Sequence, residues 1–174
     1  TDVIVDLARA FRAGLNRAGM AATGKHFPGH GAVAADSHLE LPIDRRTMGE
    51  IQRTELMPFQ PLIDDGIESL MMAHVRYTAV DDTPASFSRK WIMDVLRRDM
   101  GFSRALFCDD LVMKGAVVIG DLPERARMAL AAGCDMLPVC NDREASIALL
   151  DALKDVRQSV TRSARLARLF RRES

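Results

Sequence analysis

Residues 90–111, KWIMDVLRRDMGFSRALFCDDL, contain in order a helical stretch, a glycine and a short apolar run that ends in two aspartates. The helical stretch is predicted to end at Gly101, because glycine readily adopts the backbone conformation that closes a helix. The run that follows is continuously apolar, which is typical of a strand buried on both faces of a parallel sheet. Asp109 and Asp110 come directly after this strand.

The same unit occurs three more times along the chain. Helical stretches are predicted to end near Gly19, at Gly66 and at Gly133, and lead into the apolar runs AATGKHF (21–27), IESLMMAHV (67–75) and CDMLPVCN (134–141). A further helix is predicted through residues 144–153. The first helical stretch puts five apolar side chains on one face: Val5, Leu7, Ala8, Phe11 and Leu15. Alternation of helices with apolar strands indicates an α/β fold.

Four strand–helix units are half of an eight-unit barrel. A half barrel alone would leave two strand edges and the inner face of the sheet unpaired, and the sequence begins inside a helix. We therefore predict that residues 1–174 are the C-terminal half of a single (β/α)₈ TIM-barrel catalytic domain, with a basic helix at about 152–174. A doubly wound open sheet is the alternative.

The composition limits the classes of partner. The 174 residues are 48% hydrophobic and 28% charged, as in a soluble globular domain, and 24 Lys and Arg balance 24 Asp and Glu. Without net charge, neither nucleic acid nor an anionic membrane is an expected partner. The sequence shows no leader and no apolar run of about 18 residues. Three cysteines, Cys108, Cys134 and Cys140, form no C-x-x-C pair and suit a reducing compartment, so the cytoplasm is expected. We interpret them as small apolar residues near strands.

Polar side chains follow each predicted strand, and α/β folds place their chemistry at these carboxyl ends. They are Lys25 and His26, His74, Asp109 and Asp110, and Asn141. His74 fits a buried histidine and a ligand contact equally well. Adjacent side chains on a strand face opposite ways, so only one of the two aspartates can point into a site. The other is then free to cap the next turn.

Residues 25–38, KHFPGHGAVAADSH, hold three of the four histidines. Pro28 and Gly29 exclude a regular helix, so the i, i+4 spacing of His26 and His30 does not make a helical zinc site. Asp36 and His38 fit a pair in which the carboxylate orients the imidazole, or else a turn cap beside an exposed histidine.

Lys25 is compatible with three roles. It can hold a hydroxyl or carboxylate of a ligand, form a Schiff base, or pair with a neighbouring acid. The residues alone do not choose among them.

KHFPGHGAVAADSH, MMAHV, FCDDLVMKGA and AGCDMLPVCN, in this order, resemble glycoside hydrolase family 3, in particular its bacterial cytoplasmic β-N-acetylhexosaminidases of peptidoglycan recycling. The resemblance covers about residues 5–152. It implies a retaining exo-β-N-acetylglucosaminidase that removes terminal N-acetylglucosamine from 1,6-anhydromuramyl (muro)peptides, with or without stem peptide. It also implies a small-molecule sugar substrate, no cofactor or metal, and a monomer when the chain is full length.

The family pattern assigns roles to residues of this sequence. Asp109 falls at the nucleophile, His38 at the general acid/base, and Asp36 at its supporting carboxylate, whereas Lys25 and His26 fall at the sugar-binding pair. A histidine suits the acid/base role, because its ordinary pKa lies near neutral pH. On a glycine-rich loop, His38 is expected to swing between protonating the leaving oxygen and deprotonating water.

The sequence departs from the family pattern in two ways. Cys108 replaces the usual serine before the nucleophile, a change from one small residue to another. Family members are also about twice as long, and their first half supplies an acidic sugar-binding residue and an arginine contact.

Two other functions are compatible with the residues. One is a metal-dependent (β/α)₈ hydrolase that uses His26, His30, His38 and Asp109. The other is an incomplete, non-catalytic fragment that binds sugar.

Overall fold

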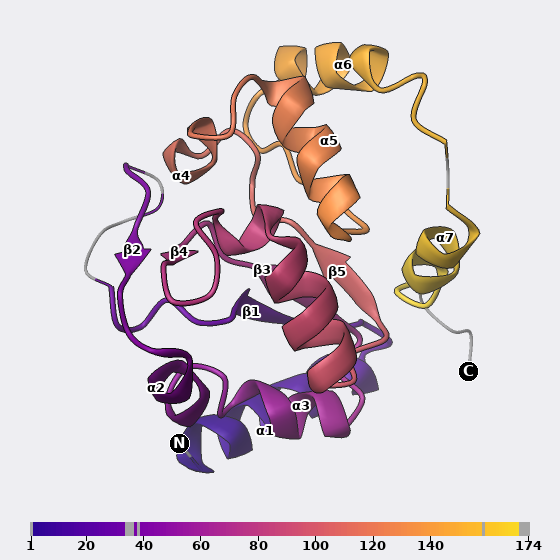
Figure 1. Cartoon of the computed structure of the whole chain (residues 1–174). Coiled ribbons are helices and arrows are strands. Elements are labelled where there is room, and N and C mark those ends of the chain that lie inside the picture. Colours follow the sequence, from indigo (N-terminus) through magenta and orange to yellow (C-terminus); the bar gives the residue numbers. More distant parts are fainter. Residues whose placement is uncertain (1, 34–36, 38, 158, 171–174) are drawn as a thin grey trace.

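A computed structural model of the chain describes residues 2–33, 37, 39–157 and 159–170, and a three-stranded parallel sheet lies at its centre (Figure 1). The strand order is β1-β3-β5. These strands cover Thr23–Phe27, Ser69–Met72 and Ala105–Phe107. Thr23 pairs with Ser69, and Ser69 pairs with Ala105, so the three strands start level with one another. The predicted α/β fold with a parallel sheet is therefore confirmed.

The fourth predicted strand is reduced to a single parallel bridge between Phe107 and Met136. Two backbone bonds extend this contact: Cys108 N donates to Met136 O over 2.9 Å, and Leu111 N donates to Pro138 O over 3.0 Å. Pro138 has no N–H to offer a ladder, which is one reason why the segment does not form a longer strand.

Helices lie around the sheet (Figure 1). Helices α4, α5 and α6 lie at one end of the molecule, and α1, α2 and α3 lie at the other. The helical elements are α1 (Asp2–Arg17), α2 (Met48–Arg53), α3 (Phe59–Asp64), the 3₁₀ turn η1 (Ala85–Phe87), the π-helix η2 (Lys90–Asp99), α4 (Lys114–Val117), α5 (Leu122–Ala132), α6 (Arg143–Ala152) and α7 (Val160–Ala167). A second, two-residue parallel pair joins β2 (Ile43–Asp44) to β4 (Arg76–Tyr77), which the sequence analysis did not predict.

The four predicted helix-ending glycines all have a positive φ. The values are 74° at Gly19, 77° at Gly66, 72° at Gly101 and 122° at Gly133. A residue with a Cβ is strained in this conformation, so glycine is the residue that lets the chain turn from each helix toward the following strand.

Two predicted helices are shorter in the structure. The stretch from residue 48 to Gly66 divides into α2 and α3 around Pro58, which cannot donate a helical hydrogen bond and so starts a new helix. In the described part of the basic helix expected at about 152–174, residues 153–157 are turn and coil and the helix is α7. Ser159 begins α7, and its hydroxyl accepts a hydrogen bond from Arg162 N.

Aromatic rings fill the core beside β1. Phe27 meets Phe59 edge to face at 5.2 Å between ring centroids and meets Trp91 at 6.2 Å, and Tyr77 meets Trp91 at 5.1 Å. Phe27, Tyr77 and Trp91 are fully buried, and burial of such rings is the main stabilising contribution of a core. This core fixes the strand that carries Lys25 and His26.

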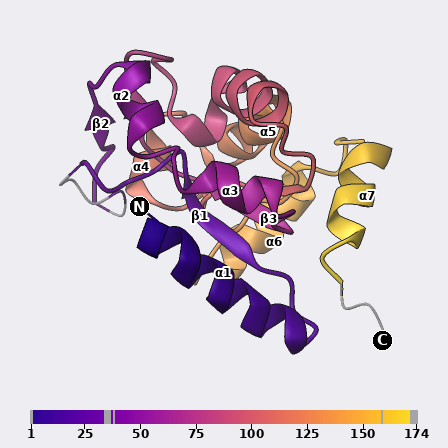
Figure 2. The same ribbon diagram turned by 90° about the horizontal axis from the view of Figure 1, so that it is seen from below.

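Parts of the molecule that were expected to be covered are exposed. The apolar face predicted for α1 is only partly packed: Val5 is buried, but Leu7 and Phe11 are 66% and 73% exposed. Figure 2 shows α1 along the outer side of the molecule, next to β1. Strand β1 is also not buried on both faces, since Thr23 and Lys25 are exposed. Among the described residues, no helix is both long and apolar enough to cross a membrane.

Candidate functional site

A pocket of about 670 Å³ lies at the carboxyl ends of the three strands. It collects side chains from β1 and the loop after it, from β3, from the loop after β5, and from the segment after Met136. Its lining residues are Lys25, His26, His30, Ser37, Met71, Asp109, Asp110, Met113, Pro138, Cys140 and Asn141. The sequence analysis placed most of the polar members of this set together from strand positions alone.

Strand β1 supplies two neighbouring side chains to this pocket through an irregularity in its register. Lys25 pairs with Met71 and Phe27 pairs with Met72, so His26 is an extra residue opposite the partner strand. Such a bulge changes the direction of a side chain. In a regular strand Lys25 and His26 would face opposite sides, whereas here both line the same pocket.

Asp109 follows β5 and faces His26. Its Oδ1 accepts a hydrogen bond from Asp110 N over 2.9 Å, and its Oδ2 lies 3.8 Å from His26 Nε2. The residue is only 9% exposed. One carboxylate oxygen is thus held by the backbone, and the other is directed toward the imidazole of the neighbouring site residue.

Asp110 has a structural role in holding two loops. Its Oδ1 accepts hydrogen bonds from Val112 N and Cys140 N, each over 3.1 Å. This matches the alternative in which one of the two aspartates caps the following turn. Asp110 therefore connects the loop after β5 to the segment that contains Cys140.

His74 lies beneath the pocket and is fully buried. Its ring stacks on Phe87 at 5.3 Å, and its Nε2 lies 2.9 Å from Asp110 O. Burial lowers the pKa of His74, although the Asp109 carboxylate opposes the shift. Because a carbonyl only accepts, Nε2 carries the proton, and the buried Nδ1 of the neutral ring has no hydrogen-bond partner among the residues that the structure describes. Of the two predicted roles for His74, the structure matches the buried histidine.

Two predicted site residues, Asp36 and His38, lie outside the described residues. Ser37, which stands between them in the chain, is described and lines the pocket. Its carbonyl accepts a hydrogen bond from Gly115 N over 2.9 Å. His30 also lines the pocket.

The part of the chain that the structure describes holds no group of three or more His, Cys, Asp or Glu side chains arranged to bind a metal ion. The cysteines are all free. Cys108 and Cys134 are buried, as expected for small apolar residues, and burial raises the pKa of the Cys108 thiol.

Sequence reasoning missed Cys140 as a pocket residue. It was interpreted as a small apolar residue near a strand, but it is exposed and lines the pocket beside Asn141. Asn141 has a φ of 59°, and Asp142 caps α6 by accepting from Ala145 N over 2.8 Å. The signal that could have placed Cys140 in the pocket is its position next to Asn141, at the end of an apolar run.

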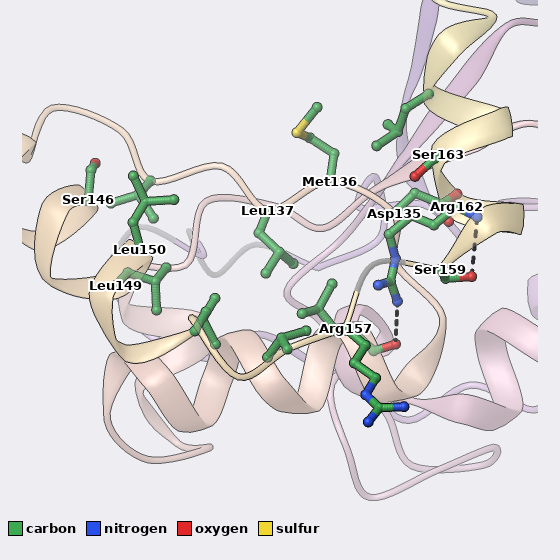
Figure 3. A pocket seen from close by; sticks show the side chains of 15 residues that line it. Asp135, Met136, Leu137, Ser146, Leu149, Leu150, Arg157, Ser159, Arg162 and Ser163 are labelled. Carbon is green, nitrogen blue, oxygen red and sulfur yellow. Dashed lines mark hydrogen bonds between the residues drawn. The ribbon is translucent and has the colours of Figure 1, made fainter.

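A second cavity of about 620 Å³ lies between α5, α6, α7 and the segment around Leu137 (Figure 3). Leucine side chains form much of its wall, including Leu137, Leu149 and Leu150. Its carboxylate, Asp135, is already bound by Arg97 and Arg165. In the strand-end pocket, by contrast, the Asp109 carboxylate lies beside the imidazole of His26.

The chain matches known proteins over almost its full length. Residues 1–169 match the profile of the Glycosyl hydrolase family 3 N terminal domain. A protein named Beta-hexosaminidase from Tolumonas auensis is 55% identical over 153 residues, which are 87% of this chain and 46% of that protein. A Beta-hexosaminidase from Haemophilus influenzae is 51% identical over 172 residues, 97% of this chain and 49% of the relative. The chain thus spans about half the length of these curated relatives.

Solved structures show the same likeness. Native NagZ from Neisseria gonorrhoeae superposes with a TM-score of 0.88 at 39% identity, over 99% of this chain and 49% of that one. The same enzyme in complex with N-trifluoroacetyl-D-glucosamine gives a TM-score of 0.86 at 40% identity, over 99% and 50% of the two chains.

Proposed function

The chain belongs to glycosyl hydrolase family 3, and on that premise we propose that it supplies the catalytic carboxylate and acid/base residues of a retaining exo-β-N-acetylglucosaminidase. The observation that carries this proposal is the pair at the strand-end pocket, where Asp109 Oδ2 lies 3.8 Å from His26 Nε2. A related enzyme, 40% identical, was crystallised with N-trifluoroacetyl-D-glucosamine. This supports an N-acetylglucosamine ring as the group bound here.

In the proposed reaction, the Asp109 carboxylate attacks the anomeric carbon of the sugar. The bond from that carbon to the leaving oxygen breaks, and the leaving oxygen takes a proton from His38. Water then attacks the same carbon and gives a proton to His38, and the bond to Asp109 breaks. Two displacements retain the configuration at the anomeric carbon.

The other site residues bind and orient. Lys25 and His26 hold the N-acetylglucosamine ring, and Asp36 orients the imidazole of His38. Asp109 is suited to the nucleophilic role because Asp110 N holds its Oδ1, leaving Oδ2 on the His26 side. Asp110 is engaged with two backbone N–H groups and is not proposed as the nucleophile.

The proposed substrate is N-acetylglucosaminyl-1,6-anhydro-N-acetylmuramic acid, with or without stem peptide. This choice comes from the sequence resemblance, and the name Beta-hexosaminidase of the relatives supports its hexosaminide part. We also propose that the full-length protein is a cytoplasmic monomer. In this proposal it uses no cofactor and binds neither nucleic acid nor a membrane.

Residues 1–174 are proposed to be the C-terminal half of a single (β/α)₈ catalytic domain. The relatives are about twice as long as the match. Leu7 and Phe11 on α1 leave an apolar surface open at one end, and the leucine-lined cavity lies near the Met136 segment at the other. A preceding half that packs on both surfaces would complete the barrel.

The test is hydrolysis of a nitrophenyl N-acetyl-β-glucosaminide by the full catalytic domain. Asp109→Ala is expected to lower kcat about 10⁴-fold or more. Asp82→Ala, at an exposed aspartate outside the pocket, is the matched control and should retain full activity. Normal turnover by the Asp109 variant would refute the proposal.

Two arms of the same experiment test the alternatives. Hydrolysis that survives a chelator excludes the metal-dependent hydrolase with His26, His30, His38 and Asp109. Binding of N-acetylglucosamine without turnover in the full domain would indicate the non-catalytic alternative.

A further inference from the structure

Ser37 is seated against the short helix α4 by one backbone hydrogen bond. Gly115 N donates to Ser37 O over 2.9 Å, and Ser37 is 6% exposed. Gly115 lies in the first turn of α4, where backbone N–H groups have no partner within the helix. The carbonyl of Ser37 therefore satisfies an N–H group that would otherwise be buried without a partner.

Position 115 has no room for a side chain. A Cβ on Gly115 would lie 3.0 Å from His74 Cβ and 3.2 Å from both His74 O and Ser37 O. Gly115 does not belong to the glycines with positive φ, so its backbone conformation does not require glycine. The requirement is the close approach of three chain segments.

The neighbour on the other side of Gly115 is fixed. His74 is fully buried, stacked on Phe87 and bonded through Nε2 to Asp110 O. Because Asp110 directly follows Asp109, a displaced His74 would disturb the strand end that carries the proposed nucleophile. A side chain at position 115 therefore displaces Ser37 and α4 more readily than His74.

Ser37 is covalently joined to the two residues of the proposed acid/base pair. Asp36 and His38 directly flank Ser37 in the sequence, so each is joined to it by a single peptide bond. A shift of Ser37 is transmitted to both neighbours. Misplacement of a catalytic group by about 1 Å can cost about 10²-fold in rate.

We propose that Gly115 is a positioning residue for general acid/base catalysis: its N–H group and its missing side chain set how Ser37 sits between His74 and α4, and thereby where Asp36 and His38 stand relative to Asp109. This inference rests on the proposed glycosidase function. It assigns Gly115 no contact with the sugar.

The test compares leaving groups in the full catalytic domain carrying Gly115→Ala. A dinitrophenyl group leaves without protonation, whereas the sugar oxygen of a disaccharide needs the acid. We expect kcat/KM for the disaccharide to fall about 10²-fold and that for the dinitrophenyl glycoside to fall less than about 5-fold. Azide, which attacks without a general base, should accelerate turnover of the dinitrophenyl substrate by the variant.

The controls separate positioning from damage to the fold. Gly14→Ala in α1, where the nearest heavy atom to the new Cβ is 3.9 Å away, should match the wild type with both substrates. Affinity for N-acetylglucosamine should change less than about 3-fold in Gly115→Ala, because Lys25 and His26 are untouched. If Gly115→Ala does not fold, Ser37→Gly is the second variant. It makes the backbone at residue 37 more flexible, and it should show the same dependence on the leaving group.

The outcomes are distinguishable from failure of the proposed function. An inactive wild type, or an active Asp109→Ala variant, would overturn the function itself. The role of Gly115 alone would be overturned if the wild type behaves as proposed but Gly115→Ala loses activity equally on both substrates, or on neither. If Gly115→Ala does not fold, the same result for Ser37→Gly would overturn it.

Discussion

Asp109 Oδ2 lies 3.8 Å from His26 Nε2, although Asp109 follows β5 and His26 lies in β1, and these strands are not adjacent in the sheet. Strand β3 lies between them, and the contact is made above its carboxyl end. The His26 bulge and the turn after β5 together make this contact, so the site depends on the register of the whole sheet.

His26→Ala is expected to weaken binding of N-acetylglucosamine, because the imidazole is proposed to contact the ring. An uncharged hydrogen bond to a ligand is worth about 0.5–1.5 kcal/mol, so the dissociation constant should rise about 2- to 13-fold. Calorimetric titration in the full domain measures this. His30→Ala is the control, since His30 also lines the pocket but is not assigned to the sugar. An unchanged dissociation constant for His26→Ala would remove it from the binding site.

Asp110→Ala is expected to destabilise the protein by about 1–3 kcal/mol, because it removes the acceptor of two backbone N–H groups. Asp110→Asn keeps an oxygen in place and should cost less than half as much. Urea unfolding measures both. Equal losses for the two variants would show that the carboxylate oxygen does not hold these loops.

Asp135→Ala should cost about 3–5 kcal/mol, because a buried charge loses its partner. Asp135 is 2% exposed at its side chain and pairs with Arg97 and Arg165, each over 3.1 Å. Burial lowers the pKa of Arg97 to about 10. Asp155→Ala, which breaks an exposed pair with Arg127, is the matched control and should cost far less. A small loss at both positions would contradict the importance of the buried cluster.

The lowered pKa of buried His74 predicts that the free energy of unfolding falls on mild acidification. Burial lowers its pKa below the ordinary 6.5 in the folded state, so the unfolded chain binds a proton more readily. The stabilisation is complete above pH 6.5 and is lost as the pH falls from 6.5 toward the folded pKa. Over that window, the free energy of unfolding should fall by up to about 1.4 kcal/mol per pH unit relative to His74→Gln. Parallel curves for the two proteins would contradict this prediction.

Much of the architecture could be predicted from local sequence. The glycines at 19, 66, 101 and 133 end helices because φ is positive at each, and this preference is visible in the residue type. The polar residues after each apolar run converge because parallel strands share a carboxyl edge. Strand geometry also predicts different directions for Asp109 and Asp110: Asp109 faces His26 and Asp110 accepts from two backbone N–H groups, although both line the pocket.

Other features depend on tertiary contacts that the sequence does not display. The bulge at His26 is set by pairing with β3, and the predicted long helix before Gly66 divides at Pro58. The exposure of Leu7 and Phe11 could not be predicted from an amphipathic pattern, because the pattern does not tell which side chains have a partner. The contact of Gly115 with His74 and Ser37 joins three distant segments.

The most direct test of the central claim is covalent trapping of the nucleophile. The full domain is treated with a 2-fluoro sugar that carries a good leaving group, digested, and mapped by mass spectrometry. The account predicts a glycosyl group on Asp109 and no labelling of Asp109→Ala. A label on Asp110 or on another residue, or turnover with inverted configuration and no label, would contradict it.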